Sequence, residues 1–124
     1  MKDSKLWTLH LFAGVVILFL LGLHMGIMHL DEIFKIFNPA GEEGIDWENV
    51  LARMEMFGFA IVYILLLGFA LYHGFYGLNK IIEEINIKDK TKKTFSIFLT
   101  LFAFVLFIIG TYSAIAAKVV SSKF

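Results

Sequence analysis

Three long stretches of this chain contain no Asp, Glu, Lys or Arg: residues 6–30, 56–79 and 94–117. The 11 basic and 11 acidic residues of the chain all lie outside these stretches. A helix needs about 20 apolar residues to cross a bilayer, and each stretch is longer than that. Backbone polar groups cannot be left unpaired in lipid, so each span must be helical. The sequence predicts an all-α protein with three transmembrane helices.

The composition excludes several other classes of protein. The chain is 59% hydrophobic and 18% charged, whereas soluble domains have about 45–50% apolar and about 25% charged residues. With no cysteine and this patterning, a soluble enzyme, a nucleic-acid binder and a disulfide-built secreted domain are excluded. No small-residue cleavage motif follows the first span, so we expect it to stay in the mature protein. No repeat or boundary divides residues 1–124, which predicts a single transmembrane domain.

The Lys/Arg bias of the short flanks predicts the orientation. The N-terminal flank and the second loop, residues 80–93, hold seven basic residues, and the first loop and the C-terminus hold four. The two groups are Lys2, Lys5, Lys80, Lys88, Lys90, Lys92 and Lys93, and Lys35, Arg53, Lys118 and Lys123. We therefore expect a multi-pass protein of the inner (cytoplasmic) membrane, with its N-terminus inside and its C-terminus outside.

Shorter elements are expected between the spans. Residues 31–37 alternate apolar pairs with charges, which suits a short helix in the headgroup region. Asp46 is the expected N-cap of a second helix that begins at Trp47 and runs into the second span. That span is expected to project past the bilayer as far as Ile85, and Thr91 is the expected cap of the third span.

Four histidines lie within the uncharged spans: His10, His24, His29 and His73. Ionisable groups in a membrane helix are costly and usually face the bundle interior or a site. Without cysteine, thiolate metal sites and iron–sulfur ligation by this chain are excluded, and no phosphate loop, Ser/His/Asp arrangement or HExxH pattern is present. Imidazoles among apolar and glycine neighbours suit haem held by axial histidines.

The depths of two histidines in the membrane are informative. His24 lies toward the outside and His73 toward the cytoplasm, each roughly 9–12 Å from its helix centre at about 1.5 Å per residue. One haem cannot bridge both, so they imply two haems, or one haem and a bystander. Gly77 lies one turn from His73, and Gly22 and Gly26 form a small-residue pair around His24 that admits a helix or a macrocycle.

The remaining histidines have plainer expected roles. His10, at the cytoplasmic rim, is expected to be a hydrogen-bonded packing residue. His29 lies at the outer interface next to Asp31, where an interfacial or propionate-contacting role is favoured over iron ligation. For His24 and His73, taken one at a time, packing also remains an open reading.

Residues 70–84 contain His73-Gly-Phe-Tyr-Gly77-Leu-Asn-Lys80 followed by Glu83 and Glu84. This segment resembles the second-helix motif of succinate dehydrogenase and fumarate reductase membrane anchors, H-x-x-x-G followed by a basic or polar and then an acidic residue. The resemblance implies that His73 is an axial ligand of the haem nearer the iron–sulfur subunit. Gly77 is then the spacer beside it, and we expect Lys80 to contact the cofactor.

Residues 12–25 are similar to the first helix of di-haem fumarate reductase cytochrome b subunits, with Gly14 early and Gly22 and His24 late. The resemblance implies that His24 ligates the distal haem. Those subunits have five helices and four ligands, whereas this chain has three spans and one histidine for each haem. It is therefore expected to be half of a split anchor, pairing with a second small membrane subunit into a haem-binding helix bundle. The motif (H/Q)-R-x-(S/T)-(A/G) of the mono-haem anchors is absent.

The function implied is that of a non-catalytic electron-transfer subunit of a succinate:quinone oxidoreductase or quinol:fumarate reductase. It would hold haem b, two per complex, and pass electrons between quinone and the iron–sulfur subunit. The iron–sulfur and flavoprotein subunits are expected to dock on the cytoplasmic loop 80–93. Glu55 is the candidate proton acceptor for quinol near the distal haem, although charges at helix ends are more commonly only solvated.

Three alternatives stay open from the sequence. The first is a haem-free, quinone-binding anchor of the same family. The second is a small b-type cytochrome of another redox complex, such as a hydrogenase or formate dehydrogenase. The third is a non-redox small membrane protein, for which buried charges or broken helices along a path would be expected.

Overall fold

The computed structural model describes residues 2–29, 45–56 and 58–123. Within them lie four helices: α1 (Lys2–His29), α2 (Trp47–Glu55), α3 (Phe59–Glu84) and α4 (Asp89–Ser121). Of these, α1, α3 and α4 are long and apolar enough to cross a membrane. The predicted all-α architecture with three spans is confirmed. The helix expected over residues 31–37 lies outside the described residues.

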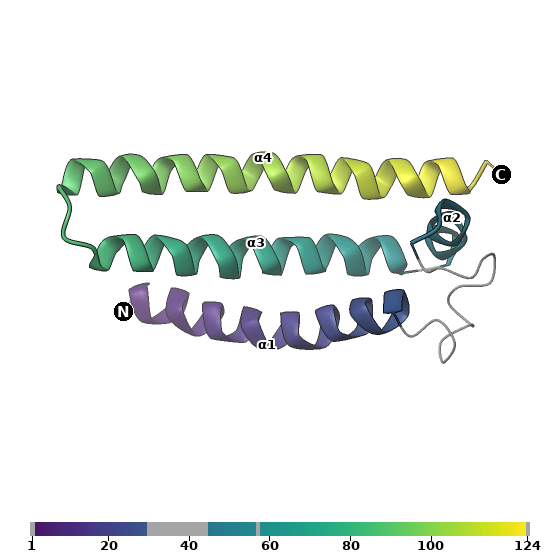
Figure 1. The fold of residues 1–124 in the computed structure, drawn as a ribbon, viewed down its shortest axis with the longest axis horizontal. Coiled ribbons are helices and arrows are strands. Elements are labelled where there is room, and N and C mark those ends of the chain that lie inside the picture. The colour runs from purple at the N-terminus through teal and green to yellow at the C-terminus, as the bar shows by residue number, and fades with distance from the viewer. Residues whose placement is uncertain (1, 30–44, 57, 124) are drawn as a thin grey trace.

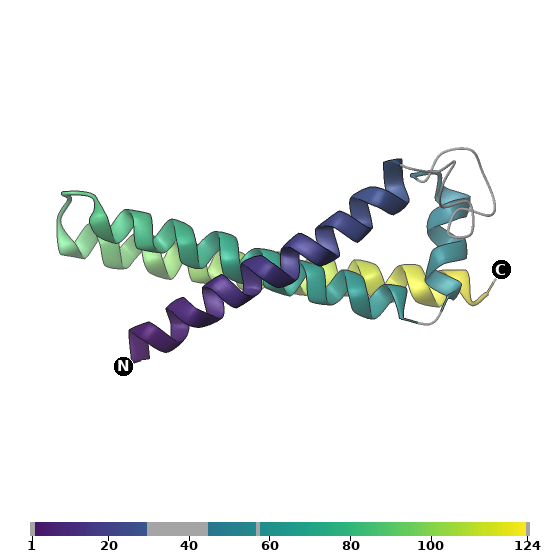
Figure 2. The ribbon, with the colours of Figure 1, turned by 90° about the horizontal axis from the view of Figure 1, so that it is seen from below.

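The middle of the bundle is α3, with α4 antiparallel to it on one side and α1 on the other (Figure 1). Seen from below, α1 crosses the α3–α4 pair obliquely (Figure 2). Within the described residues α1 packs against α3 and not against α4. We call the end with the turn between α3 and α4 the turn end; the N-terminus of α1 is also there. The opposite end, where α2 lies, is the α2 end (Figure 1).

Small residues allow α3 and α4 to approach closely. Gly110 faces the side chain of Leu67, and a Cβ built on Gly68 would lie 3.3 Å from Phe107. Close packing on small residues is a common source of helix association where lipid offers no hydrophobic driving force. Nearer the turn end the rings of Phe75 and Phe102 meet edge to face, with centroids 5.9 Å apart.

The expectation that the helix from Trp47 runs into the second span is wrong. This helix, α2, ends at Glu55, and Met56 is extended (φ −65°, ψ 134°). Gly58 follows with φ 97°, a left-handed conformation that glycine adopts at little cost, and α3 begins at Phe59. As expected, Asp46 is the N-cap residue of α2, and its carbonyl accepts the amide of Val50 at 2.9 Å.

The boundaries at the turn end also differ in one respect from expectation. As predicted, α3 projects beyond residue 79, to Glu84. Thr91, however, is not the cap of α4, which begins at Asp89 with Lys88 as N-cap. The carbonyl of Lys88 accepts the amides of Thr91 and Lys92 at 2.9 and 3.1 Å, so Thr91 already belongs to the first helical turn.

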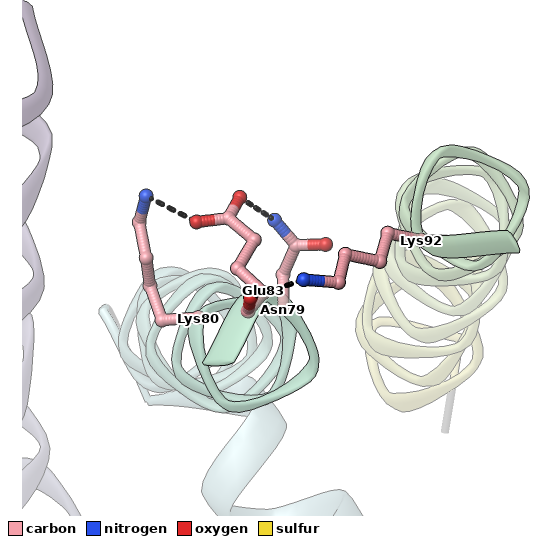
Figure 3. A network of polar contacts seen from close by, with 4 residues as sticks. All are labelled: Asn79, Lys80, Glu83 and Lys92. Carbon is pink, nitrogen blue, oxygen red and sulfur yellow. Dashed lines mark hydrogen bonds and ion pairs between the residues drawn. The ribbon is translucent and has the colours of Figure 1, made fainter. Parts of the chain in front are cut away.

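Glu83 is the centre of a polar network that joins α3 to α4 at the turn end (Figure 3). Its carboxylate accepts hydrogen bonds from Lys80 at 2.8 Å and from Asn79 at 3.1 Å. Lys92 of α4 donates to the backbone carbonyl of Glu83 at 2.6 Å. That carbonyl lies in the last turn of α3, where intrahelical partners are lacking, so Lys92 also acts as a C-terminal cap.

Candidate functional site

His10 of α1 and His73 of α3 stack face to face where the two helices cross. Their ring centroids are 4.1 Å apart and their planes differ by 4°. His10 is only 8% exposed, and His73 is half-buried. The sequence predicts a packing role for His10, and in the structure its ring stacks on that of His73, the predicted haem ligand.

Each imidazole also lies against a glycine of the other helix. A Cβ built on Gly14 would lie 3.0 Å from Cε1 of His73, and one built on Gly77 would lie 3.1 Å from Cε1 of His10. Each glycine follows the histidine of its own helix by four residues, which places it on the same helix face. The crossing therefore consists of two H-x-x-x-G segments, and the histidine of each segment packs on the glycine of the other.

One hydrogen bond determines which nitrogen of His73 is available for a ligand. Nδ1 of His73 lies 3.0 Å from the backbone carbonyl oxygen of His10. A carbonyl only accepts, so Nδ1 carries the proton and donates it, which leaves the lone pair on Nε2. Metal-bound histidines are commonly oriented in this way by a backbone carbonyl. The hydrogen bond thus gives His73 a tautomer with the lone pair on Nε2, the nitrogen that is then able to bind a metal.

Further aromatic side chains surround His10. Trp7 stacks on its ring at 5.2 Å between centroids, and Tyr76 packs on it at 5.2 Å with a tilt of 41°. Tyr72 stacks on Tyr76 and donates its hydroxyl hydrogen bond to the carbonyl of Leu6 at 2.9 Å. These contacts hold the N-terminal half of α1 on α3.

A cavity of about 650 Å³ lies beside this cluster, between α3, α4 and the start of α1. Its walls are mostly apolar. The polar side chains that line it are Tyr72, Tyr76, Asn79, Ser96 and Thr100. The Tyr76 hydroxyl has no hydrogen-bond partner among the described residues. An apolar cavity with a few polar groups at one end suits an amphiphile with a small polar head.

The second predicted ligand, His24, lies toward the α2 end. Its ring meets Tyr63 of α3 edge to face, with centroids 5.7 Å apart. Among the described residues its Nδ1 is buried without a hydrogen-bond partner, so no bond to protein fixes its tautomer as it does for His73. A Cβ built on Gly22 would meet nothing within 4 Å, so the surface of α1 beside His24 is open. His24 has space for a flat ligand and lacks the orienting bond.

Buried polar side chains of α2 and α4 lie at the α2 end. The side chain of Arg53 is 1% exposed, and one of its nitrogens donates to Sδ of Met28 on α1 at 3.7 Å. Asn49 of α2 and Ser121 of α4 are also buried. This end therefore holds a buried cation on the same side of the bundle midpoint as His24.

The other predicted site residues divide between the two ends. Lys80 is at the turn end, where its Nζ lies 5.6 Å from the Tyr76 ring centroid. His29 is exposed at the last residue of α1, and Glu55 is exposed at the last residue of α2. The structure thus brings His73, Gly77 and Lys80 into one region and leaves His24, Gly22, His29 and Glu55 in the other half.

Sequence reasoning missed His10 and Gly14 as site residues. The signal was present, because His10 and Gly14 repeat the four-residue spacing of His73 and Gly77. Within the described residues, no three histidine or acidic side chains converge on one point that a metal ion would occupy.

Three spanning helices, with imidazoles and glycines at a helix crossing, define the class as a polytopic all-α membrane subunit. The chain belongs to the succinate dehydrogenase/fumarate reductase transmembrane subunit family, whose model matches residues 1–110. It is 26% identical over 118 residues to the succinate dehydrogenase hydrophobic membrane anchor subunit of Thermoplasma acidophilum, covering 92% of this chain and 89% of that one. No solved structure matches it significantly. The family resemblance read from the sequence is confirmed.

Proposed function

We propose that this protein is the cytochrome b anchor of its complex, holding haem b and passing electrons between a membrane quinone and the iron–sulfur subunit. The observation that carries the proposal is the hydrogen bond from Nδ1 of His73 to the carbonyl of His10. It leaves Nε2 of a half-buried imidazole free to coordinate iron, in a chain whose family anchors a redox enzyme in the membrane.

The chain's own residues would hold and orient the cofactor. His73 would be one axial ligand, and the missing Cβ of Gly14 lets its ring lie close against α1. Bound haem supplies a centre that takes up and releases one electron at a time. Coordination by His73 and by a second neutral imidazole would leave the iron no open position, which would favour electron transfer over oxygen binding. The second imidazole would come from a second small anchor subunit.

His24 would serve a second haem nearer the α2 end. The open surface beside Gly22 and the buried, unbonded Nδ1 of His24 support this role. Arg53 is a buried cation at the same end and would suit the propionates of that haem. His29 is the other candidate contact for a propionate.

Quinone would use the cavity beside the imidazole pair. Its apolar walls suit an isoprenoid tail, and the Tyr76 hydroxyl and Asn79 amide suit the carbonyls of a quinone ring. Glu55 remains the proposed proton acceptor for a quinol that reacts at the α2 end.

Two variants distinguish these sites. Slower quinone reduction in Tyr76→Phe but not in Glu55→Gln would assign the reaction to the turn end. The reverse result would assign it to the α2 end.

The turn end would face the cytoplasm and dock the iron–sulfur and flavoprotein subunits. Lys80 and Lys92 donate hydrogen bonds to Glu83. Lys88, Lys90 and Lys93 are exposed at this end. An exposed lysine group favours an acidic partner surface by electrostatic complementarity.

The direct test is a reduced-minus-oxidised spectrum of the purified complex with a haem-to-chain ratio. We expect a b-type spectrum and two haems per copy of this chain, because His73 and His24 would each supply one ligand to a different haem. His73→Ala and His24→Ala should each remove one haem. A complex that is assembled but contains no b-type haem contradicts the proposal and favours the haem-free anchor.

A further inference from the structure

We infer that His10 is a positioning residue that sets the ring plane and tautomer of His73. The inference rests on the proposed role of His73 as haem ligand and assigns to its neighbour on α1 a role in tuning that ligand. It stands on the stacked geometry, the hydrogen bond between the two residues and the burial of His10.

The backbone of His10 acts on the tautomer. In a helix its carbonyl already accepts the amide of residue 14, and the second lone pair is available for His73. The ring of His73 reaches this lone pair because residue 14 is glycine. A methyl group there would lie 3.0 Å from Cε1 and 3.3 Å from Nδ1 of His73, which is too close for the ring to keep its position.

The side chain of His10 acts on the ring plane. A single hydrogen bond leaves the His73 imidazole free to tilt about the bonded nitrogen, and a parallel ring 4.1 Å away blocks that tilt on one face. The His10 ring is itself held by Trp7, by Tyr76 and by the surface of Gly77. The orientation of the His73 ring plane therefore depends on the angle at which α1 crosses α3.

Packing alone would give a different result. If His10 only filled space, its replacement would lower the stability of the crossing and leave the ligand geometry of assembled molecules unchanged. If it positions His73, assembled molecules that lack the ring should show an altered imidazole orientation. Low-spin ferric haem reports that orientation in the g values of its electron paramagnetic resonance (EPR) spectrum, and the midpoint potential responds to the ligand's hydrogen bond.

The experiment uses the complete complex in its membrane or in nanodiscs, with three variants. His10→Ala removes the ring and keeps the carbonyl, His10→Phe restores a flat ring, and Gly14→Ala disturbs the approach of His73. Gly74→Ala is the matched control, because a Cβ there meets nothing within 4 Å. We expect shifted g values of one haem in His10→Ala, shifted g values and midpoint potential in Gly14→Ala, wild-type g values in His10→Phe, and no change in Gly74→Ala.

A readout that does not depend on haem separates this inference from the proposed function. In complex labelled with ¹⁵N-histidine and produced without haem, solid-state NMR should show His73 protonated at Nδ1, and Gly14→Ala should give mixed tautomers. Wild-type g values and potential in both His10→Ala and Gly14→Ala overturn the inference. If His10→Ala does not assemble, Gly14→Ala and the tautomer decide. If the wild-type complex contains no haem, the proposed function is wrong, and the tautomer measurement still tests whether His10 positions His73.

Discussion

Lys118 of α4 donates a hydrogen bond to the backbone carbonyl of Glu55 at 2.9 Å, which joins the end of the last spanning helix to the end of α2. Arg53 of α2 reaches Met28 of α1 in turn. Since α1 does not pack against α4 in the described part of the chain, α2 connects these two helices at this end. The short helix α2 therefore has a structural role: it links the ends of α1 and α4.

Arg53→Leu should destabilise the assembled protein by roughly 1.5–3 kcal/mol, because it removes the hydrogen bond that the charged guanidinium donates to Sδ of Met28. The free energy of unfolding in detergent, from denaturant titration, measures this loss. Lys123→Leu is the control, since Lys123 is exposed past the end of α4. Equal stability of the two variants would show that Arg53 does not hold the α2 end together.

The contact between Gly110 and Leu67 gives a second prediction, for the α3–α4 interface. A Cβ at residue 110 collides with the Leu67 side chain, so Gly110→Ala should cost about 1–3 kcal/mol of stability through overpacking. Shortening the opposing side chain in Gly110→Ala/Leu67→Ala should recover part of that loss. Thermal unfolding of the single and double variants measures the coupling. Strict additivity of the two changes would refute a direct contact.

The three spans follow from the sequence because lipid leaves the backbone no alternative to a helix. The placement of His73 in the half of the bundle near the turn end follows for the same reason, since depth depends only on counting residues along one helix. Gly77 was also found from the sequence, because it shares a face with His73.

The pairing of His10 with His73 depends on how α1 is rotated and tilted against α3, a property of packing between distant segments. No periodicity within either helix reports that rotation. The break between α2 and α3 was missed for a related reason. Any glycine can adopt the left-handed conformation that Gly58 has, so the sequence alone does not place a break there.

Gly77 gives a third prediction. A Cβ there would lie 3.1 Å from Cε1 of His10, so Gly77→Ala should push the two rings or the two helices apart. We expect a lower yield of haem-loaded complex, measured as the haem-to-protein ratio after purification. Gly74 lies three residues before Gly77, and a Cβ there meets nothing within 4 Å, so Gly74→Ala should keep the wild-type ratio. An unchanged ratio in Gly77→Ala would mean that the crossing tolerates a methyl group and is looser than the contact implies.

The network around Glu83 gives the last prediction, which separates stability from docking at the turn end. Lys80 and Glu83 are 32% and 48% exposed in their side chains, so their ion pair is screened by water. Glu83→Gln should therefore change the free energy of unfolding by no more than about 1 kcal/mol. Charge reversal of the exposed lysines Lys88, Lys90 and Lys93 to Glu should leave stability equally unaffected and weaken retention of the iron–sulfur subunit.

Pull-down of the iron–sulfur subunit at increasing salt measures that retention. Wild-type binding should weaken as salt rises, because screening acts on exposed charges, and the charge-reversed variant should already be weak at low salt. Replacement of the same lysines by arginine, which keeps the positive charge, is the matched control and should retain the subunit. Retention by the charge-reversed variant at all salt concentrations would exclude this loop as the docking surface and would point to contacts made by the partner anchor subunit instead.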